Sequence, residues 1–281
     1  MGKRWPALDV DTAGQTEADL AQATADDFAP TAVEDTAAGL RFFFPNAADR
    51  DRAAAALLPR FSVSPLDVDD EDWARRSQQD LAPVTVGRLT ILPAPPARPD
   101  VPALPALVIP PSMGFGTGHH ATTRLCLAAL QQIDLTGAEV LDLGTGSGVL
   151  AMAAVHLGAA RALGVDDDQD AIQSAVESLA LNPGLPAERI LFVVGDLMTM
   201  EVAPADVVTA NLTGGLLIRA ADRLRQALKP GGALIMSGLQ AHERDEVWRA
   251  FAGLELEAEG EEDGWITFTA RRLSNGLGAR G

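Results

Sequence analysis

The 281-residue chain contains one cysteine, Cys126, and only four histidines. A single cysteine excludes an internal disulfide and any metal site built from several cysteines. Cys126 lies between two leucines in a stretch that we expect to be helical, and no motif pairs it with a general base. We therefore predict a buried structural thiol rather than a nucleophile, and no bound metal.

Basic residues are also scarce. The chain has 22 lysines and arginines against 39 aspartates and glutamates, a formal net charge of −17. Proteins that bind nucleic acid need clustered basic side chains to contact phosphates, so direct nucleic-acid binding is not expected. The acidic balance favours a basic partner, or serves only to keep the protein soluble.

Long hydrophobic runs are absent as well. The best candidate, residues 149–165, is interrupted by His156 and Arg161, and it is shorter than the roughly 20 residues of a membrane span. Acidic residues begin at Asp9, where a signal peptide would need an apolar core. These features predict a cytoplasmic protein that does not bind membranes, and we expect a monomer.

The N-terminal region alternates strand and helix patterns. Strand-like and helix-like stretches follow in the order βαββαβ, which predicts a small α+β domain of the ferredoxin-like type over residues 1–66. The acidic stretch that follows, with two arginines behind it, suits a connecting helix. Residues 84–92 carry strand signals, and prolines from Pro93 onward mark an irregular connection, so residues 67–105 are predicted to be a connecting helix and linker.

The rest of the chain has a regular βα alternation. Apolar strand patterns and helical patterns follow each other from about residue 106, and the last two strands are expected to be antiparallel. This alternation predicts an α/β domain with a doubly wound, mainly parallel sheet over residues 106–273. Residues 274–281 are predicted to be a flexible tail.

A glycine turn organises this second domain. The strand at 140–143 runs into Gly144, Gly146 and Gly148, and a helical pattern begins at Val149. A dinucleotide site would need a further glycine where Val149 stands. Asp142, two residues before the first glycine, would repel a pyrophosphate but would suit a cationic ligand such as S-adenosylmethionine.

Polar residues end the next three strands. Asp166 stands 22 positions after Gly144, near the spacing at which a carboxylate binds ribose hydroxyls, although NAD would place one there too. Asp196 is placed to meet an adenine amino group or to cap a helix. Asn211 is placed to accept from an amine or to close a turn, because ligands bind at the carboxyl ends of parallel strands.

A second glycine-rich loop is more specific. It reads FGTGHHATT at 115–123, which is similar to the F-G-T-G-x-H-x-T-T signature of the ribosomal protein L11 methyltransferase family (PrmA type). DLGTGSG at 142–148, Asp166 and ANL at 210–212 also follow in the family's order, so the chain resembles this family over almost its whole length. The resemblance implies a seven-stranded class I methyltransferase (Rossmann-like) domain behind an N-terminal substrate-recognition domain.

The resemblance also implies the cofactor, S-adenosyl-L-methionine, and assigns residues to it. Together with the residues of the glycine turn and strand ends, the expected cofactor-binding set is Thr123, Gly144, Asp166, Asn211, Asp142, Gly146, Phe115 and Asp196. Asn211 is the expected catalytic residue, and His120 matches the family's histidine without being assigned as a base. Gly214 and Leu216 stand where the family has alanine and proline, and this difference concerns the specificity for the acceptor.

The implied reaction is attack of a neutral amine on the sulfonium methyl of the cofactor. Lysine has an ordinary pKa of about 10.4, so its amine must lose a proton, and a nearby positive charge and desolvation both favour that loss. The expected function is protein-lysine N-methylation of a basic ribosomal protein. Another protein lysine or a small amine is the alternative acceptor, and a non-catalytic cofactor-binding module is the alternative from another class.

Overall fold

The computed structural model describes residues 4–25, 28, 30–36, 38–69, 82–95, 106–111 and 118–274. The chain divides into two compact units, residues 1–80 and 81–281. The predicted connecting helix after residue 69 and the predicted tail from residue 275 lie outside the described residues.

The first unit is a four-stranded sheet with two helices. Its strands are β1 (Arg4–Asp11), β2 (Ala32–Thr36), β3 (Gly39–Phe43) and β4 (Val63–Asp69), and its helices are α1 (Gln15–Ala25) and α2 (Ala47–Leu57). The strand order is β2-β3-β1-β4, with every neighbouring pair antiparallel. The predicted βαββαβ order of elements is therefore observed.

One face of this sheet holds the core of the unit. Leu8, Phe42 and Phe44 are fully buried, together with Leu57 of α2. Asn46 caps the start of helix α2, because its side chain accepts a hydrogen bond from the Asp49 backbone N–H at 3.0 Å. The two buried residues of α2, Ala53 and Leu57, are four positions apart, so they lie on the same side of the helix.

The second unit contains ten strands, five α-helices and two short 3₁₀-helices among its described residues. The strands are β5 (Val84–Val86), β6 (Leu89–Leu92), β7 (Ala106–Val108), β8 (Glu139–Leu143), β9 (Arg161–Asp166), β10 (Ile190–Val194), β11 (Ala205–Asn211), β12 (Leu228–Gln240), β13 (Leu254–Glu262) and β14 (Trp265–Arg272). The helices are α4 (Ala121–Leu130), α5 (Val149–His156), α6 (Gln169–Ala180), α7 (Gly214–Gln226) and α8 (Arg244–Ala250), with η2 (Ala187–Arg189) and η3 (Ala241–Glu243).

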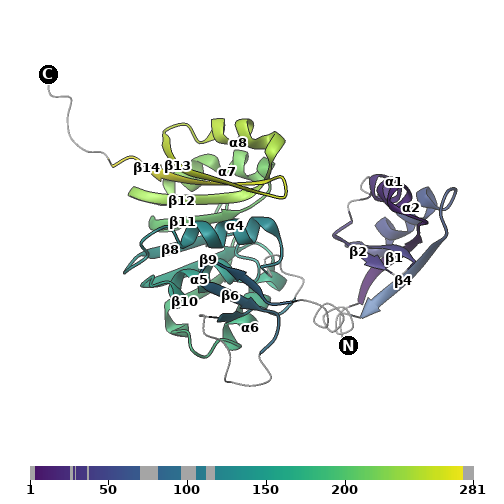
Figure 1. Ribbon diagram of the computed structural model, residues 1–281, viewed down its shortest axis with the longest axis horizontal. Helices are drawn as coiled ribbons and strands as arrows, with labels where there is room; N and C mark the ends of the chain where they lie inside the picture. The colour runs from purple at the N-terminus through teal and green to yellow at the C-terminus, as the bar shows by residue number, and fades with distance from the viewer. Residues whose placement is uncertain are drawn as a thin grey trace. The chain divides into compact units, whose positions relative to one another are not determined.

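Seven of these strands form one sheet, in the order β10-β9-β8-β11-β12-β14-β13 (Figure 1). The first five are mutually parallel, whereas β14 is antiparallel to both β12 and β13. The chain order reverses between β8 and β11, which creates the crevice where such sheets bind ligands. The predicted doubly wound sheet with an antiparallel end is confirmed.

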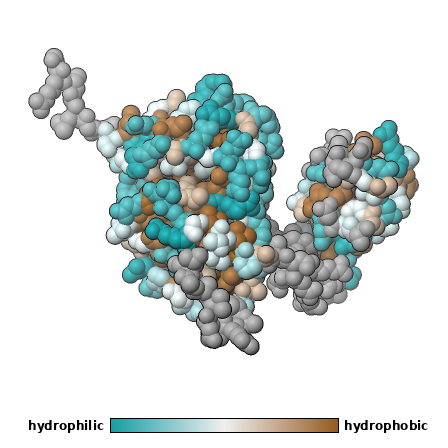
Figure 2. Space-filling model, in the orientation of Figure 1, coloured by the Kyte–Doolittle hydropathy of each residue, from teal (hydrophilic) through white to brown (hydrophobic). Residues whose placement is uncertain are grey.

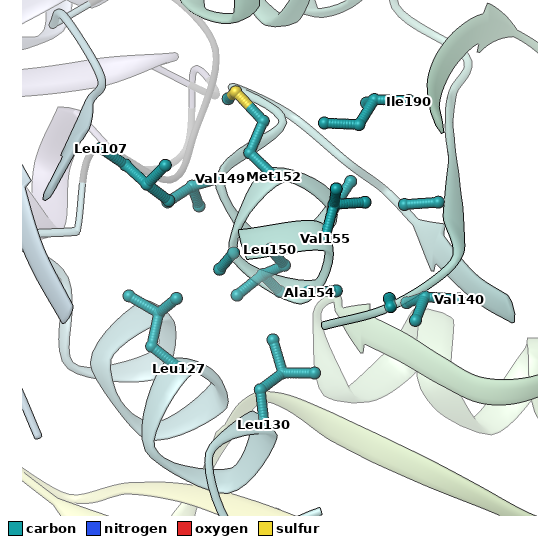
Figure 3. Packing of buried hydrophobic residues seen from close by; sticks show 14 of the residues in the cluster. Leu107, Leu127, Leu130, Val140, Val149, Leu150, Met152, Ala154, Val155 and Ile190 are labelled. Atoms are coloured by element: carbon teal, nitrogen blue, oxygen red, sulfur yellow. The ribbon is translucent and has the colours of Figure 1, made fainter. Parts of the chain in front are cut away.

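Helices cover both faces of this sheet. The cluster on one face includes α4, α5 and α6, and the cluster on the other includes α7 and α8. Figure 3 looks along α5 and shows Leu127 and Leu130 of α4 on one side of it and Val140 and Ile190 on the other. Helix α5 is apolar all around because it is enclosed, with every residue from Val149 to Val155 buried.

The predicted boundary between linker and second domain is wrong. Strands β5 and β6 fall inside the predicted linker of residues 67–105, yet they pair with β7 in a three-stranded sheet. Leu89 and Ile91 are fully buried in the same cluster as α5, so this segment belongs to the core of the second unit. The prolines that suggested a linker begin only after β6. The first unit also extends past residue 66, because β4 runs to Asp69.

The surface of the second unit carries both hydrophilic and hydrophobic residues (Figure 2). Figure 2 shows hydrophilic residues over α8, where Arg244, Asp245 and Glu246 begin the helix. Among the described residues, no helix is long and apolar enough to cross a membrane.

Candidate functional site

A cavity of about 720 Å³ opens at the carboxyl ends of β8, β9 and β11. This is the crevice that the reversal of strand order predicts. Its walls come from the glycine turn, the ends of β9 and β11, the start of α4 and the start of β14. Its lining includes His120, Thr122, Gly144, Gly146, Asp166, Asp196, Met198, Asn211, Leu212, Arg219, Gly238 and Trp265.

The glycine turn forms the floor of this cavity. Gly144, Gly146 and Gly148 all have positive φ, at 74°, 52° and 78°, a region that side chains disfavour. The Gly144 N–H donates to Val165 O of β9 at 2.8 Å, which holds the turn against the neighbouring strand. Both Gly144 and Gly146 line the cavity, as expected for a turn that lets a ligand approach the backbone.

Asp142 lies beneath the turn and does not line the cavity. Its side chain is fully buried, and its carboxylate accepts hydrogen bonds from Thr145 Oγ1 at 2.7 Å and Thr209 Oγ1 at 2.6 Å. Burial raises the pKa of Asp142 to about 6, although both hydroxyls lower it. The prediction of direct ligand contact by Asp142 therefore needs correction, because both carboxylate oxygens hold the turn to β11.

Asp166 lies in the cavity with a fixed orientation. Its Oδ2 accepts from the Gly146 N–H at 2.9 Å, and its Oδ1 accepts from the Asp168 N–H at 3.1 Å. Asp167, Asp168 and Asp196 also line the cavity. Among the described lining residues, Arg219 is the one guanidinium or ammonium group. This excess of carboxylates suits a cationic ligand without phosphate, as the sequence predicts.

Asp196 caps a turn and not the helix that one of its two alternatives expected. It lines the cavity, and its carboxylate also caps the turn that follows β10. Its Oδ1 accepts from the Met198 N–H at 2.7 Å, and its Oδ2 accepts from Thr199 Oγ1 at 3.2 Å. The cap holds the carboxylate in place at the cavity wall.

Two buried oxygen atoms at the site have no hydrogen-bond partner among the described residues. They are Oδ1 of Asn211, which ends β11 and lines the cavity, and Oγ1 of Thr123 in the first turn of α4. Thr123 is 1% exposed and does not itself line the cavity, whereas Thr122 beside it does. Buried polar atoms are normally paired, so these two oxygens fit a site that a polar ligand completes.

An aromatic wall at the cavity was not predicted. The rings of His120 and Trp265 meet edge to face, with centroids 4.9 Å apart, and both residues line the cavity. His120 also caps α4, because its Nδ1 accepts from the Thr122 N–H at 3.3 Å, and burial followed by the charge of Arg124 lowers its pKa. No signal in the sequence marks Trp265. It reaches the site because β14 is antiparallel and starts at this edge.

The remaining predicted residues have plain outcomes. Phe115 lies outside the described residues. Cys126 is fully buried, and burial raises the pKa of its thiol, so the prediction of a structural cysteine is confirmed. Within the described part of the chain, no cluster of three or more histidine, cysteine, aspartate or glutamate residues is arranged to hold a metal ion.

Comparisons with known proteins find one family. The family model for ribosomal protein L11 methyltransferase (PrmA) matches residues 16–273. A ribosomal protein L11 methyltransferase of Pseudomonas aeruginosa is 38% identical over 220 residues, which cover 78% of this chain and 73% of that protein. One from Deinococcus radiodurans is 42% identical over 214 residues, covering 72% and 78%.

A solved structure is similar as well. The ribosomal protein L11 methylase of Lactobacillus delbrueckii subsp. bulgaricus matches with a TM-score of 0.61 and 26% identity. The match covers 69% of this chain and all of that chain.

Proposed function

The chain belongs to the ribosomal protein L11 methyltransferase family, and from this premise we propose that it methylates a lysine amine of a ribosomal protein with S-adenosylmethionine as methyl donor. The observation that carries the proposal is the buried, unpartnered Oδ1 of Asn211 in the wall of a carboxylate-lined cavity. A carbonyl oxygen in that position accepts an N–H from a neutral amine and orients the nitrogen lone pair toward the cavity.

The proposed cofactor residues surround the same cavity. When bound, S-adenosylmethionine supplies a methyl group on a positively charged sulfonium. In this proposal Asp166 accepts from the ribose hydroxyls, Asp196 accepts from the adenine amino group, and the Thr123 hydroxyl, beside the lining residue Thr122, binds the methionine end. Gly144 and Gly146 let the backbone approach the ligand, while Asp142 supports the turn from below.

Two effects favour the neutral form of the acceptor amine and oppose the lining carboxylates, which favour the charged form. A lysine that reaches Asn211 leaves bulk water and lies against the half-buried Trp265 and His120. Desolvation lowers the pKa of an ammonium group, and a cationic ligand nearby lowers it further. The chain's contribution is therefore to orient the amine and to exclude water. Because the electrophile is already reactive, this positioning supplies a large part of the rate enhancement.

We propose that the first unit is a ferredoxin-like domain that recognises the substrate. Its support is the βαββαβ order with antiparallel neighbours, together with its charge. Residues 1–80 hold 16 acidic and 8 basic residues, a charge that attracts a basic protein. We also propose that the reaction takes place in the cytoplasm, because the proposed substrate is a ribosomal protein.

The acceptor is tested by methyl transfer from labelled cofactor into a lysate from cells that lack this enzyme. We expect one labelled ribosomal protein, with the label on lysine. Label on a different protein or on small amines would contradict the proposed acceptor. Exchange of residues 1–69 for an unrelated domain should abolish this label while leaving cofactor affinity unchanged, and retained labelling would reject the docking role.

Asn211→Ala tests the catalytic assignment in the same assay. We expect kcat to fall about 100-fold, as when one oriented polar group at a reacting centre is removed. The cofactor Kd should rise less than about tenfold, because one hydrogen bond contributes only about 1 kcal/mol. Equal losses in kcat and in cofactor affinity would show that Asn211 acts on the cofactor alone.

A further inference from the structure

The position of Asn211 depends on its backbone. Because Oδ1 has no hydrogen-bond partner among the described residues, no such contact holds this end of the side chain in place. The backbone, in contrast, is fixed by β12: Asn211 pairs in register with Ser237, and the Leu212 N–H donates to Ser237 O at 2.9 Å. Whatever holds Leu212 therefore also holds Asn211.

On one side, Leu212 lies against an irregular point of β12. The pairing of β12 with β14 shifts register between Ser237 and Leu239, and Gly238 between them has a φ of +91°. A Cβ added at Gly238 would lie 2.2 Å from Leu212 O and 2.7 Å from Leu212 C. Irregularities of this kind occur beside active sites, where they redirect a neighbouring side chain. Only glycine leaves room for the Leu212 backbone here.

On the other side, Leu212 covers the glycine turn. A Cβ added at Gly144 would lie 2.3 Å from Leu212 Cδ2, so the leucine methyl rests directly on the Gly144 backbone. Leu212 itself is half-buried and lines the cavity. One residue thus contacts the turn that is assigned to the cofactor and strand β12, and it directly follows Asn211, the residue assigned to the acceptor.

We propose that Leu212, seated between Gly144 and Gly238, is a positioning residue that sets the distance between the cofactor turn and the amide of Asn211. This inference rests on the proposed methyl transfer at Asn211. Its physical content is steric: the Leu212 backbone packs against Gly238, where a Cβ would collide with it, and the Leu212 side chain packs against Gly144. Methyl transfer needs the amine aligned with the reacting carbon, so a small displacement of this loop costs rate rather than cofactor binding.

The test compares Gly238→Ala with Gly253→Ala. Gly253 has a φ of +96°, close to that of Gly238, but an added Cβ there meets no atom within 4 Å. Both variants introduce similar backbone strain, and only Gly238→Ala displaces Leu212. We expect Gly238→Ala to lower kcat about 100-fold, the cost of a misplacement near 1 Å, with the cofactor Kd unchanged within about twofold. Gly253→Ala should keep kcat within about twofold.

A second pair of variants covers the possibility that Gly238→Ala fails to fold. Leu212→Ala removes the side chain from Gly144 and should lower kcat about tenfold or more, whereas Leu212→Met, which has a similar volume, should restore most of the rate. Equal kcat in Gly238→Ala and Gly253→Ala, or wild-type kcat in Leu212→Ala, would overturn the positioning role. Absence of methyl transfer by the wild-type enzyme would instead overturn the proposed function.

Discussion

At the scale of single residues, burial separates two carboxylates that flank the glycine turn. Asp166 lines the cavity, with its carboxylate oriented by two backbone N–H groups. Asp142 is sealed beneath the turn, where two threonine hydroxyls replace water around its carboxylate. The two aspartates therefore have different surroundings, one lining the cavity and one supporting the turn, although both end or nearly end a strand.

The buried carboxylate of Asp142 predicts a pH dependence of stability. Its pKa is raised from 3.8 to about 6, so between these values the folded state keeps a proton that the unfolded state has lost. The stability contributed by the protonated form is present below pH 4 and is lost as pH rises through 6. A shift of this size corresponds to about 3 kcal/mol.

Asp142→Asn tests this prediction because it keeps the shape and removes the charge. We expect the free energy of unfolding of the wild-type protein, measured against that of Asp142→Asn by urea titration, to fall by up to about 3 kcal/mol between pH 4 and pH 7. Groups other than Asp142 titrate in both proteins and cancel in the difference. A difference that stays constant with pH would mean that Asp142 is not protonated in the folded state.

At the scale of elements, α5 shows how packing fixes the glycine turn. This eight-residue helix follows the turn directly, and neighbours from α4, β7, β8 and β10 surround it (Figure 3). Its hydrophobic side chains point in all directions, so no single amphipathic face exists. The helix is therefore enclosed by the rest of the unit. Its N-cap residue, Gly148, has a left-handed backbone conformation.

Leu150→Ala measures the contribution of this packing. Leu150 is 4% exposed, and removing its side chain should lower the free energy of unfolding by about 2–4 kcal/mol, from lost burial and the remaining cavity. Val176→Ala on α6 is the control, because Val176 is 48% exposed and should change stability by less than about 0.5 kcal/mol. Similar effects of the two substitutions in thermal or urea unfolding would contradict the enclosed position of α5.

At the scale of the whole molecule, the main electrostatic feature is a formal net charge of −17. Many arginines are paired, as with Arg41 and Asp9 or Arg244 and Glu259, but the excess of acidic residues leaves unpaired carboxylates on both units. Like charges repel one another in the compact state, which lowers stability at low ionic strength. The same field attracts a basic protein and speeds its association.

Salt should therefore stabilise this protein. We expect the thermal unfolding midpoint to rise between 0.02 M and 0.3 M sodium chloride, because the Debye length falls from about 20 Å to about 6 Å over this range. A further rise at molar salt belongs to general exclusion effects, which sulfate enhances and chloride does not. An unfolding midpoint that falls or stays level below 0.3 M would mean that attractive pairs outweigh the repulsion.

The sequence by itself determined the features that depend on neighbouring residues. The glycine turn, the βα alternation and the buried Cys126 were predicted because turn chemistry and hydrophobic period act over a few positions. The strand ends at Asp166, Asp196 and Asn211 were also predictable. The edge of a parallel sheet brings them together once the alternation is recognised.

Tertiary structure decided what depends on residues far apart in the chain. Asp142 could not be told from a ligand-binding carboxylate, because Thr209, its partner 67 positions away, is set beside it by the pairing of β8 with β11. Trp265 enters the site only through the antiparallel return of β14. Strands β5 and β6 belong to the second unit and not to a linker, because they form a sheet with β7 and pack in the same buried cluster as α5. Each outcome depends on which apolar and polar surfaces meet in the folded chain, and the local sequence pattern does not specify those long-range contacts.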